Sequence, residues 1–498
     1  MTQTANAQTQ GTQTTPMLIG GRPAYSSTGR IYEVRNPANG QVVGIVPQAT
    51  VEDANRAVEA AQAAFRGWAE TSPDDRAELL FKGIELLKQN EKEIVRLLSQ
   101  EQGKPVFEAK GEVHHLIHGL TFYAGLSSKI RGAEVPLPPA MGKYSYGVLF
   151  RRPVGVAVGI TPWNFPLTLM GTKVGPALIA GCPIIIKPAQ TTPLATLRVI
   201  ELLNEAGLPP GVLQCVTGSG SELGEPLITH PAVRRVALTG SSNTGRRVME
   251  LAGRDFKRVT LELGGSDPMI VCPDANLKAA INGAMVGRFW NAGQQCLAVK
   301  RLYVFEEVYE EFLSGLIDKV SRYELGDPST PAEKPKVRMG PLHAEFQRRE
   351  IEEQLADAVA KGAKVVLGGK RPEGLDQGFY FEPTIVTDVP EDSRLVTEEV
   401  FGPVLPVFRV KTLDEAIQKA NNSPWGLGSS IWTNNMIWAN KAVREIEAGV
   451  TWINMIHYGY DELPFGGVKA SGLGREHGPE AVDYYLEDKG AVFGGLEG

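Results

Sequence analysis

Residues 154–190, VGVAVGITPWNFPLTLMGTKVGPALIAGCPIIIKPAQ, decide the fold class because they hold two short apolar runs separated by a helical segment. The runs 154–160 and 183–186 are rich in β-branched residues, which favours strands, whereas residues 167–180 have helical periodicity. A strand, a helix and a second strand in this order predict parallel neighbours joined by a crossover. The pattern continues with strands expected at 212–216, 233–238 and 258–261, and helices at 194–206, 221–229 and 244–253. We therefore expect an α/β fold with a Rossmann-like parallel sheet, whose carboxyl edge binds nucleotides.

A second alternating series, from about residue 273 to 460, predicts a second α/β unit. Two segments, 132–152 and 484–495, fit neither unit and are expected to be strands that pair elsewhere, with another subunit as one option. The expected organisation is a disordered tail (1–16), a cofactor-binding domain (17–131 and 153–261), a catalytic domain (262–470) and the two outlying segments.

The composition excludes several classes of protein. The chain has 498 residues, a net charge of −6 and no run of Lys and Arg, which argues against a nucleic-acid partner. Four cysteines without C-x-x-C spacing predict neither a disulfide framework nor a metal site, and reduced thiols indicate a cytoplasmic protein. The polar first sixteen residues lack the features of a signal peptide, and no stretch of about 18 apolar residues predicts a membrane span.

Two segments suit a nucleotide. In VALTGSSNTG, residues 236–245, a strand runs into Gly240 and a helix starts near Thr244, so a pyrophosphate would meet free N–H groups there. The spacing G-x-x-x-x-G fits an ordinary strand–helix turn equally well. Lys187 ends a buried strand, where its ammonium could hold ribose hydroxyls or a phosphate, or simply be solvated.

Three further segments carry reactive groups. Asn164 lies between two prolines, so its amide could be a rigid oxyanion donor, or could form a common Asx turn. Glu262 interrupts an apolar strand, where burial would raise its pKa and make it a base, although alternation also permits an edge position. Cys296 follows a Gly-Gln turn and is a better candidate nucleophile than Cys182 or Cys215. Together these groups suit oxidation of a carbonyl through a thioester.

Six motifs occur in the order TPWNFPL, KPAQ, TGSSNTG, LELGGSDP, NAGQQC and EEVFGPV. Together they resemble the aldehyde dehydrogenase superfamily, in its NAD(P)-dependent, non-CoA-acylating branch, from about residue 18 to the C-terminus. The resemblance implies a cofactor domain, a catalytic domain and a small β oligomerisation flap, which the segments 132–152 and 484–495 match. A homodimer or homotetramer is therefore expected.

The resemblance also implies catalytic roles. Cys296 would attack the aldehyde to give a thiohemiacetal, whose oxyanion the Asn164 side chain and the Cys296 N–H would stabilise. Glu262 would deprotonate the water that hydrolyses the later thioester. Lys173 matches the lysine that lies behind the catalytic asparagine in this family.

The cofactor implied by the resemblance is NAD or NADP. Lys187 would hold the adenine ribose, Ser241 the pyrophosphate and Glu399 the nicotinamide ribose. The full set of expected cofactor residues is Ile160, Thr161, Trp163, Lys187, Ala189, Gln190, Gly220, Gly240, Ser241, Gly245, Leu263, Glu399 and Phe401. Many NAD-preferring members have Glu where this chain has Gln190. Because Gln removes the repulsion of a 2′-phosphate, we expect NADP to be tolerated.

The substrate is a small aldehyde whose identity the sequence leaves open. Some members that act on acidic aldehydes carry Arg where this chain has Thr172, which weakens the case for succinate semialdehyde. The expected substrate residues are aromatic: Phe165, Trp290, Tyr458, Tyr460 and Phe465. They suit an apolar or aromatic aldehyde, whereas Asp461 and Glu462 could instead receive an aminoaldehyde or face water.

Three rival functions remain. A CoA-acylating semialdehyde dehydrogenase usually lacks the base glutamate, which is present here as Glu262. A non-catalytic structural homologue typically loses the nucleophile, yet Cys296 is present. An alcohol dehydrogenase would not need a covalent cysteine, so Cys296→Ser would leave its turnover largely intact.

Overall fold

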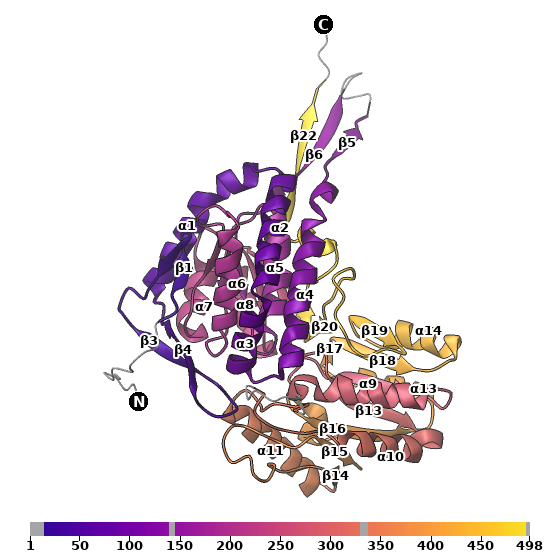
Figure 1. Cartoon of the computed structure of the whole chain (residues 1–498). Coiled ribbons are helices and arrows are strands. Elements are labelled where there is room, and N and C mark those ends of the chain that lie inside the picture. The colour runs from indigo at the N-terminus through magenta and orange to yellow at the C-terminus, as the bar shows by residue number, and fades with distance from the viewer. Residues whose placement is uncertain (1–13, 139–144, 329–336, 495–498) are drawn as a thin grey trace.

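The computed structural model describes residues 14–138, 145–328 and 337–494. Two large sheets, each covered by helices, form two lobes, and a narrow three-stranded arm projects away from both (Figure 1). The α/β fold class predicted from the sequence is confirmed.

The first sheet has the strand order β2-β1-β9-β8-β7-β10-β11-β21. Its five central strands, β7 to β11, are parallel, as the alternating pattern predicted. Their bounds are Val156–Ile160 (β7), Ile184–Lys187 (β8), Leu213–Cys215 (β9), Val233–Thr239 (β10) and Arg258–Glu262 (β11), with β1 (Met17–Ile19), β2 (Arg22–Ala24) and β21 (Gly472–Leu473) added antiparallel at the edges.

Helices cover both faces of this sheet because successive strand side chains alternate between two apolar clusters. On one face Ala157, Ile184 and Ile186 pack against α2 (Pro73–Gln89), α3 (Glu91–Gln102), α4 (Val106–Ala124), α5 (Pro166–Ala180) and α6 (Leu194–Glu205). On the other face Val156, Val158 and Ile185 pack against α1 (Val51–Glu70), α7 (Gly220–Thr229) and α8 (Ser242–Gly253). Helix α1 begins at the Thr50–Asp53 capping box that the sequence predicted.

The second sheet has the order β14-β15-β16-β13-β12-β18-β19 and is parallel except for β14. Its strands are β12 (Asp267–Val271), β13 (Val299–Phe305), β14 (Lys364–Leu367), β15 (Thr384–Thr387), β16 (Val404–Val410), β18 (Gly428–Trp432) and β19 (Val450–Ile453). Helices α9 (Leu277–Phe289), α10 (Tyr309–Val320) and α11 (Glu345–Ala360) cover one face, and α13 (Leu413–Asn421) and α14 (Met436–Glu445) cover the other. The sequence pattern did not identify β12, β15, β16 or β19.

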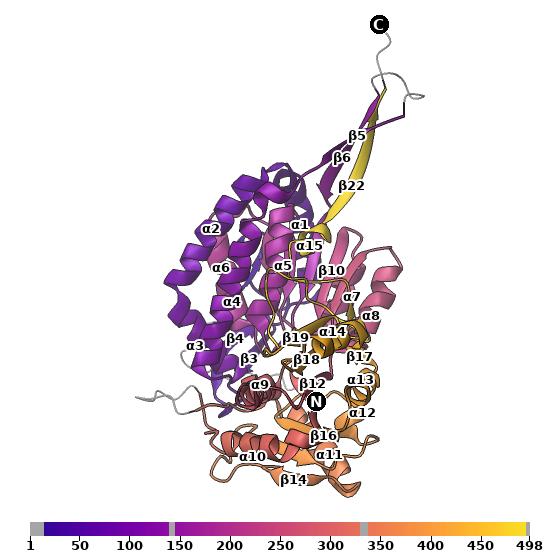
Figure 2. The ribbon, with the colours of Figure 1, turned by 90° about the vertical axis from the view of Figure 1, so that its right-hand side faces the viewer.

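The arm joins the two segments that fitted neither unit. Strand β6 (Tyr146–Pro153) pairs antiparallel with β5 (Ala133–Pro136) on one side and with β22 (Leu486–Phe493) on the other. These strands therefore pair with each other within one chain, and they extend well beyond both lobes in two perpendicular views (Figures 1 and 2).

Two further predictions concern the N-terminal segment and membrane-spanning helices. The predicted tail lies outside the described residues except for residues 14–16, where the structure differs, because the Thr15 N–H donates to the Ile45 carbonyl at 2.8 Å. This contact adds the segment to the hairpin of β3 (Ile31–Arg35) and β4 (Val42–Pro47). Among the described residues, no helix is long and apolar enough to cross a membrane.

Candidate active site

A tight left-handed turn presents Cys296. After α9, Asn291, Ala292 and Gly293 all have positive φ angles, of 51°, 53° and 75°. Such a conformation is unfavourable for Asn and Ala, so surrounding contacts must hold it. Glu108 from α4 accepts the Asn291 backbone N–H at 3.0 Å, and the Asn291 amide donates to the Asn164 carbonyl at 3.0 Å.

Cys296 is half-buried and packs against the apolar cluster that contains Phe465. The Lys300 ammonium donates to the Cys296 carbonyl at 2.7 Å. Burial raises the pKa of the Cys296 thiol to about 12, and the charge of Lys300 opposes that rise. The other three cysteines are fully buried, which supports the choice of Cys296 as the accessible nucleophile.

Hydrogen bonds hold both the side-chain amide and the backbone carbonyl of Asn164. It follows β7 in the loop before α5, and its side-chain amide donates to the Gln294 carbonyl at 3.0 Å, two residues before Cys296. Its own carbonyl accepts from the Lys104 ammonium at 2.8 Å as well as from Asn291. Because an amide NH₂ has two donors, one N–H remains for a ligand oxygen beside the nucleophile.

A buried ion pair supports this loop from behind. Lys104 pairs with Glu112 of α4, and the side chains of both residues are fully buried. The other oxygen of Glu112 accepts the backbone N–H of Leu167 at 2.8 Å, at the start of α5. The Lys104 ammonium also lies 3.9 Å from the centre of the Phe165 ring. Lys104 and Glu112 thus fix the loop that carries Asn164, a role that the sequence analysis missed.

Glu262 ends β11 as a buried carboxylate without partners. Neither of its side-chain oxygens has a hydrogen-bond partner in the described structure, and burial raises its pKa well above the usual value. Gly466 leaves room for it, since a Cβ there would lie 2.6 Å from Glu262 Oε1. Such a carboxylate accepts a proton more readily than a solvent-exposed one does, as a general base must.

Lys173 lies within a second buried network, which does not include Asn164 among its hydrogen-bond partners. Its ammonium donates to Glu476 at 2.8 Å and to the Thr239 hydroxyl at 2.7 Å. Thr172 donates to the other Glu476 oxygen at 2.7 Å, so its side chain is already engaged. The charge of Glu476 also contributes to the raised pKa of Glu262, and Lys173 opposes it. Glu476 is a site residue that the sequence analysis missed.

The expected cofactor residues gather at the carboxyl edge of the first sheet. The chain order reverses between β7 and β10, and ligands of parallel sheets bind at such switch points. Strand β7 ends at Ile160, Thr161 follows it, and Gly240 follows β10. Ser241 caps α8, accepting the Thr244 N–H at 3.2 Å. Gly245 allows close packing, since a Cβ there would lie 2.6 Å from Leu263.

Lys187, the last residue of β8, is a buried cation at this edge. Its ammonium donates to the Pro188 carbonyl at 2.9 Å, and no described carboxylate lies within ion-pair distance. Burial lowers its pKa to about 8. A buried ammonium with one neutral partner has donors left for ligand oxygens, which fits the ribose of a dinucleotide.

Gln190 lies in the loop after β8, where its amide donates to the Gln48 side chain at 3.4 Å. Gln48 in turn donates to Glu222 at 3.2 Å, and Glu222 pairs with Arg30. The Glu222 carboxylate is therefore separated from Gln190 by the Gln48 side chain, and it is paired with the Arg30 cation. Ala189 precedes Gln190, and Gly220 begins α7.

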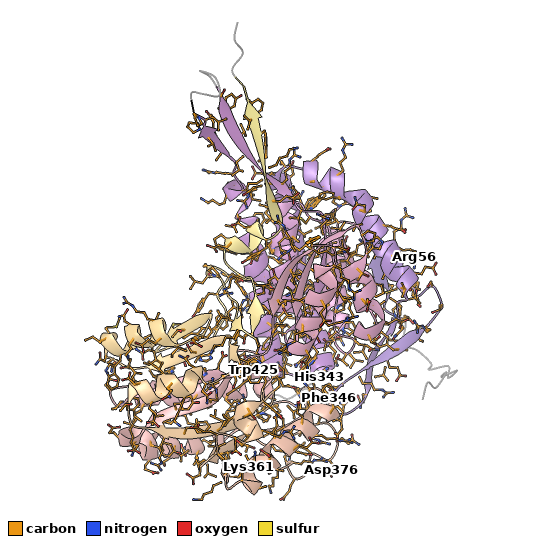
Figure 3. The ribbon with its side chains drawn as sticks, turned by 180° about the vertical axis from the view of Figure 1, so that it is seen from behind. Arg56, His343, Phe346, Lys361, Asp376 and Trp425 are labelled. Carbon is orange, nitrogen blue, oxygen red and sulfur yellow. The ribbon has the colours of Figure 1, made fainter. Side chains whose placement is uncertain are left out.

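Two residues of the second lobe approach the same region. Glu399 accepts from Lys300 at 2.9 Å and from the Gly265 N–H at 3.1 Å, which links it to the loop after Glu262. The Phe401 ring packs edge-on against Trp163, with centroids 5.7 Å apart. Trp163 stacks on His343 at 4.4 Å, and His343 lies at the junction of the lobes (Figure 3).

Three of the aromatic residues expected at the substrate side pack against other aromatic rings, and a fourth, Phe465, lies in the cluster against which Cys296 packs. Trp290 precedes the nucleophile turn and packs edge-on against Phe107 at 5.5 Å. Tyr458 and Tyr460 contact each other at 5.4 Å, and Phe465 packs near Cys296. The two acidic residues of this loop differ, because Glu462 is exposed and Asp461 is only 2 % exposed and bonded to histidines.

The site combines a sheet edge that suits a nucleotide with a thiol, a rigid amide and a buried carboxylate. These groups define a class of oxidoreductase that acts on carbonyl compounds through a covalent adduct. The family model described as "Aldehyde dehydrogenase family" matches residues 24–490. The chain therefore belongs to the aldehyde dehydrogenase family, and it is an NAD(P)-dependent enzyme that oxidises aldehydes.

Individual relatives resemble the chain over nearly its whole length. A succinate-semialdehyde dehydrogenase [NADP(+)] of Escherichia coli K12 is 39% identical, with 95% of this chain and 96% of that protein covered. A peroxisomal aminoaldehyde dehydrogenase of Pisum sativum is 39% identical, with 92% and 91% covered. A solved 3,6-anhydro-L-galactose dehydrogenase in complex with NAP has a TM-score of 0.93 at 37% identity, with 97% and 100% covered.

Proposed function

We propose that Cys296, Asn164 and Glu262 carry out the oxidation, with Lys173 as their buried support. The observation that carries this assignment is the hydrogen bond from the Asn164 amide to the Gln294 carbonyl, at 3.0 Å. This bond holds the Asn164 amide against the turn that carries the nucleophile. Donors fixed before reaction are what stabilise a developing oxyanion.

The reaction follows from these groups. The Cys296 thiol releases its proton to solvent, the sulfur bonds to the aldehyde carbon as the C=O π bond opens, and the resulting oxyanion accepts from the Asn164 amide and the Cys296 N–H. Bound NAD or NADP supplies the hydride acceptor. The acyl group then remains on sulfur as a thioester. Glu262 takes a proton from water, the water oxygen bonds to the acyl carbon, the C–S bond breaks, and the carboxylic acid leaves.

We propose that the cofactor lies along the carboxyl edge of the first sheet. Lys187 and Gln190 would meet the adenine ribose, Ser241 and the start of α8 the pyrophosphate, and Glu399 the nicotinamide ribose. The remaining residues of the expected set line the same edge or the facing lobe. Because Gln190 is neutral and Glu222 is paired with Arg30, a 2′-phosphate meets no free carboxylate among these residues. NADP is therefore accepted as well as NAD.

We propose a neutral aldehyde with an apolar or aromatic body as the substrate. Trp452 and Phe465 lie in the apolar cluster against which Cys296 packs, and Thr172 is engaged by Glu476. The named relatives act on an acidic semialdehyde, an aminoaldehyde and an anhydrosugar. Similarity to these relatives therefore does not indicate whether the substrate is acidic, basic or neutral. Asp461 disfavours an aminoaldehyde because its carboxylate is already occupied by histidine donors.

The assembly and the domain boundaries are further proposals. The arm exposes Tyr146, Phe150, Val492 and Phe493 on a sheet that both lobes leave uncovered. Such a surface suits pairing with a second copy, as a homodimer or homotetramer. The three sheets support the boundaries expected from the sequence, and the four unpaired cysteines support a cytoplasmic location.

The decisive experiment is mass spectrometry of enzyme quenched during turnover with aliphatic, aromatic, amino- and carboxy-aldehydes and each cofactor. We expect an acyl adduct on the peptide that contains Cys296, and its loss together with all turnover in Cys296→Ala. Cys272→Ala is the matched control, because that thiol is buried within the second lobe. Normal turnover by Cys296→Ala would refute the assignment.

A further inference from the structure

A cluster of histidines around one aspartate has no role in the reaction above. His115 and His118 come from α4, and Asp461 and His477 come from the loops that follow β19. Asp461 accepts from His477 Nδ1 at 2.8 Å through one oxygen and from His118 Nδ1 at 2.8 Å through the other. The side chains of Asp461 and His477 are only 2 % and 5 % exposed. We call these four residues the His–Asp cluster.

The ligand atoms in this cluster have the spacing of a metal site. One atom each from His115, Asp461 and His477 lies within 4.8 Å of the others. In a tetrahedral zinc site with bonds near 2.1 Å, the ligand atoms are about 3.4 Å apart. Small side-chain rotations would therefore bring the three atoms onto one ion.

His115 is oriented as metal-binding histidines are. One ring nitrogen, Nδ1, bonds to the Tyr458 hydroxyl at 3.0 Å. The other, Nε2, is buried without a hydrogen-bond partner in the described structure and lies 3.7 Å from Asp461 Oδ2. A metal-ligating imidazole commonly has its second nitrogen fixed by an oxygen in this way, which leaves the first nitrogen free to bind.

We propose that His115, Asp461 and His477 bind a divalent transition metal such as Zn²⁺, with His118 holding the second oxygen of Asp461. Two imidazoles and one carboxylate are a ligand set that Zn²⁺ prefers, and three protein ligands leave a fourth position for water or another oxygen. Ligating imidazoles are neutral at the bound nitrogen. The nitrogen of His477 that binds the ion therefore carries no proton in the complex.

The site lies on the approach to the nucleophile rather than at the sulfur. The His477 ring packs edge-on against Phe465 at 5.9 Å, and Phe465 belongs to the apolar cluster that contacts Cys296. Tyr458, which bonds to His115, is one of the expected substrate residues. A bound ion would therefore affect the entry or recognition of the aldehyde. This last step rests on the proposed function, whereas metal binding itself does not.

The test is calorimetric titration of Zn²⁺ into EDTA-treated full-length protein that carries Cys296→Ala, so that the reactive sulfur does not compete. We expect one Zn²⁺ per chain, and a loss of affinity of at least about tenfold when His115→Ala or His477→Ala is added. The matched control is His114→Ala, since His114 is the exposed neighbour on α4 and lies 3.2 Å from Glu91. Its affinity should equal that of the parent.

Two outcomes would overturn the metal site. One is the absence of saturable Zn²⁺ binding, and the other is equal binding by the parent and His115→Ala. Thermal unfolding in EDTA should show that His115→Ala is folded, because the described hydrogen bond of the His115 ring is to the Tyr458 hydroxyl. Because the measured quantity is Zn²⁺ binding and not turnover, these results do not depend on whether the proposed oxidation is right.

Discussion

The carboxyl edge of the first sheet and the turn that carries Cys296 are built in different ways. At the sheet edge, Ser241 caps a helix with its own hydroxyl, and Lys187 bonds to the carbonyl of its neighbour. At the nucleophile turn, Asn291 is held by Glu108, which is 183 positions away in the sequence. The first region depends on local backbone geometry, and the second depends on buried polar side chains from a distant part of the chain.

This difference follows from what each region has to do. A helix N-terminus and a strand end offer N–H groups to a ligand without further support. A left-handed turn with Asn and Ala at positive φ is unfavourable and persists only where surrounding contacts outweigh its cost. We therefore expect changes at the turn and its supports to reduce the rate strongly, and changes at the sheet edge to shift mainly the choice of cofactor.

The largest effect is expected from Glu262→Gln. The amide does not accept a proton from water, so hydrolysis of the thioester should slow by about 10²- to 10⁴-fold, the usual contribution of a general base. The acyl adduct on Cys296 should accumulate in quenched samples, with a burst of reduced cofactor that equals the enzyme concentration. A steady-state rate equal to that of the parent would contradict the assigned role.

The pH profile gives an independent test of the same group. Glu262 acts as a base only when ionised, and burial raises its pKa well above the ordinary range. The hydrolysis rate should therefore fall as the pH drops through that raised pKa, and this acid limb should disappear in Glu262→Gln.

The folded state ionises Glu262 less readily than the unfolded state does. Stability from this residue therefore declines as the pH rises from the unfolded pKa toward the folded one, and the variant should be at least as stable as the parent at neutral pH.

The comparison also explains what could be predicted from the sequence. The strands and helices of the first sheet were found because apolar runs and helical periodicity alternate clearly between residues 154 and 262. The motifs also identified the family. Strand β12 escaped because it begins with Asp267 and Pro268, which give no strand signal, although the fold buries it completely.

The residues that support the site could not be predicted from local sequence patterns. Glu112 and Lys104 look like surface residues of a helical region, yet both side chains are fully buried against the Asn164 loop. The His–Asp cluster joins His115 to Asp461 across 346 positions, whereas the cysteine spacing in the sequence predicted no metal site. Partners this distant become visible only once the chain is folded.

A smaller effect is expected from the double variant Lys104→Met with Glu112→Gln. Removing Lys104 alone would leave a buried carboxylate unpaired at a cost of about 3–5 kcal/mol, so both charges are neutralised together. The Asn164 loop then loses its support, and a misplacement of about 1 Å lowers kcat by about 10²-fold. We expect KM for the cofactor to change little, because the sheet edge is untouched.

Stopped-flow formation of reduced cofactor measures this loss, because it reports the steps before hydrolysis. Lys110→Met is the matched control, since Lys110 lies on α4 but is exposed, and its ammonium is 3.5 Å from Glu91. A drop in stability with an unchanged burst rate would show that the Lys104–Glu112 pair serves the fold rather than the position of Asn164.

The smallest effect is expected at the sheet edge, from Gln190→Glu. A carboxylate there would accept from the ribose hydroxyls of NAD but repel the 2′-phosphate of NADP, and an unfavourable charge contact of about 1.4 kcal/mol corresponds to a tenfold change. The ratio of kcat/KM for NADP to that for NAD should fall by about tenfold, with kcat for NAD unchanged. Glu222→Gln is the converse variant, because it removes the carboxylate that Gln48 and Arg30 contact, and it should leave NADP use equal or better. If the cofactor ratio of the parent already favours NAD strongly, Gln190 is not the residue that admits the phosphate, and the discrimination lies elsewhere on this edge.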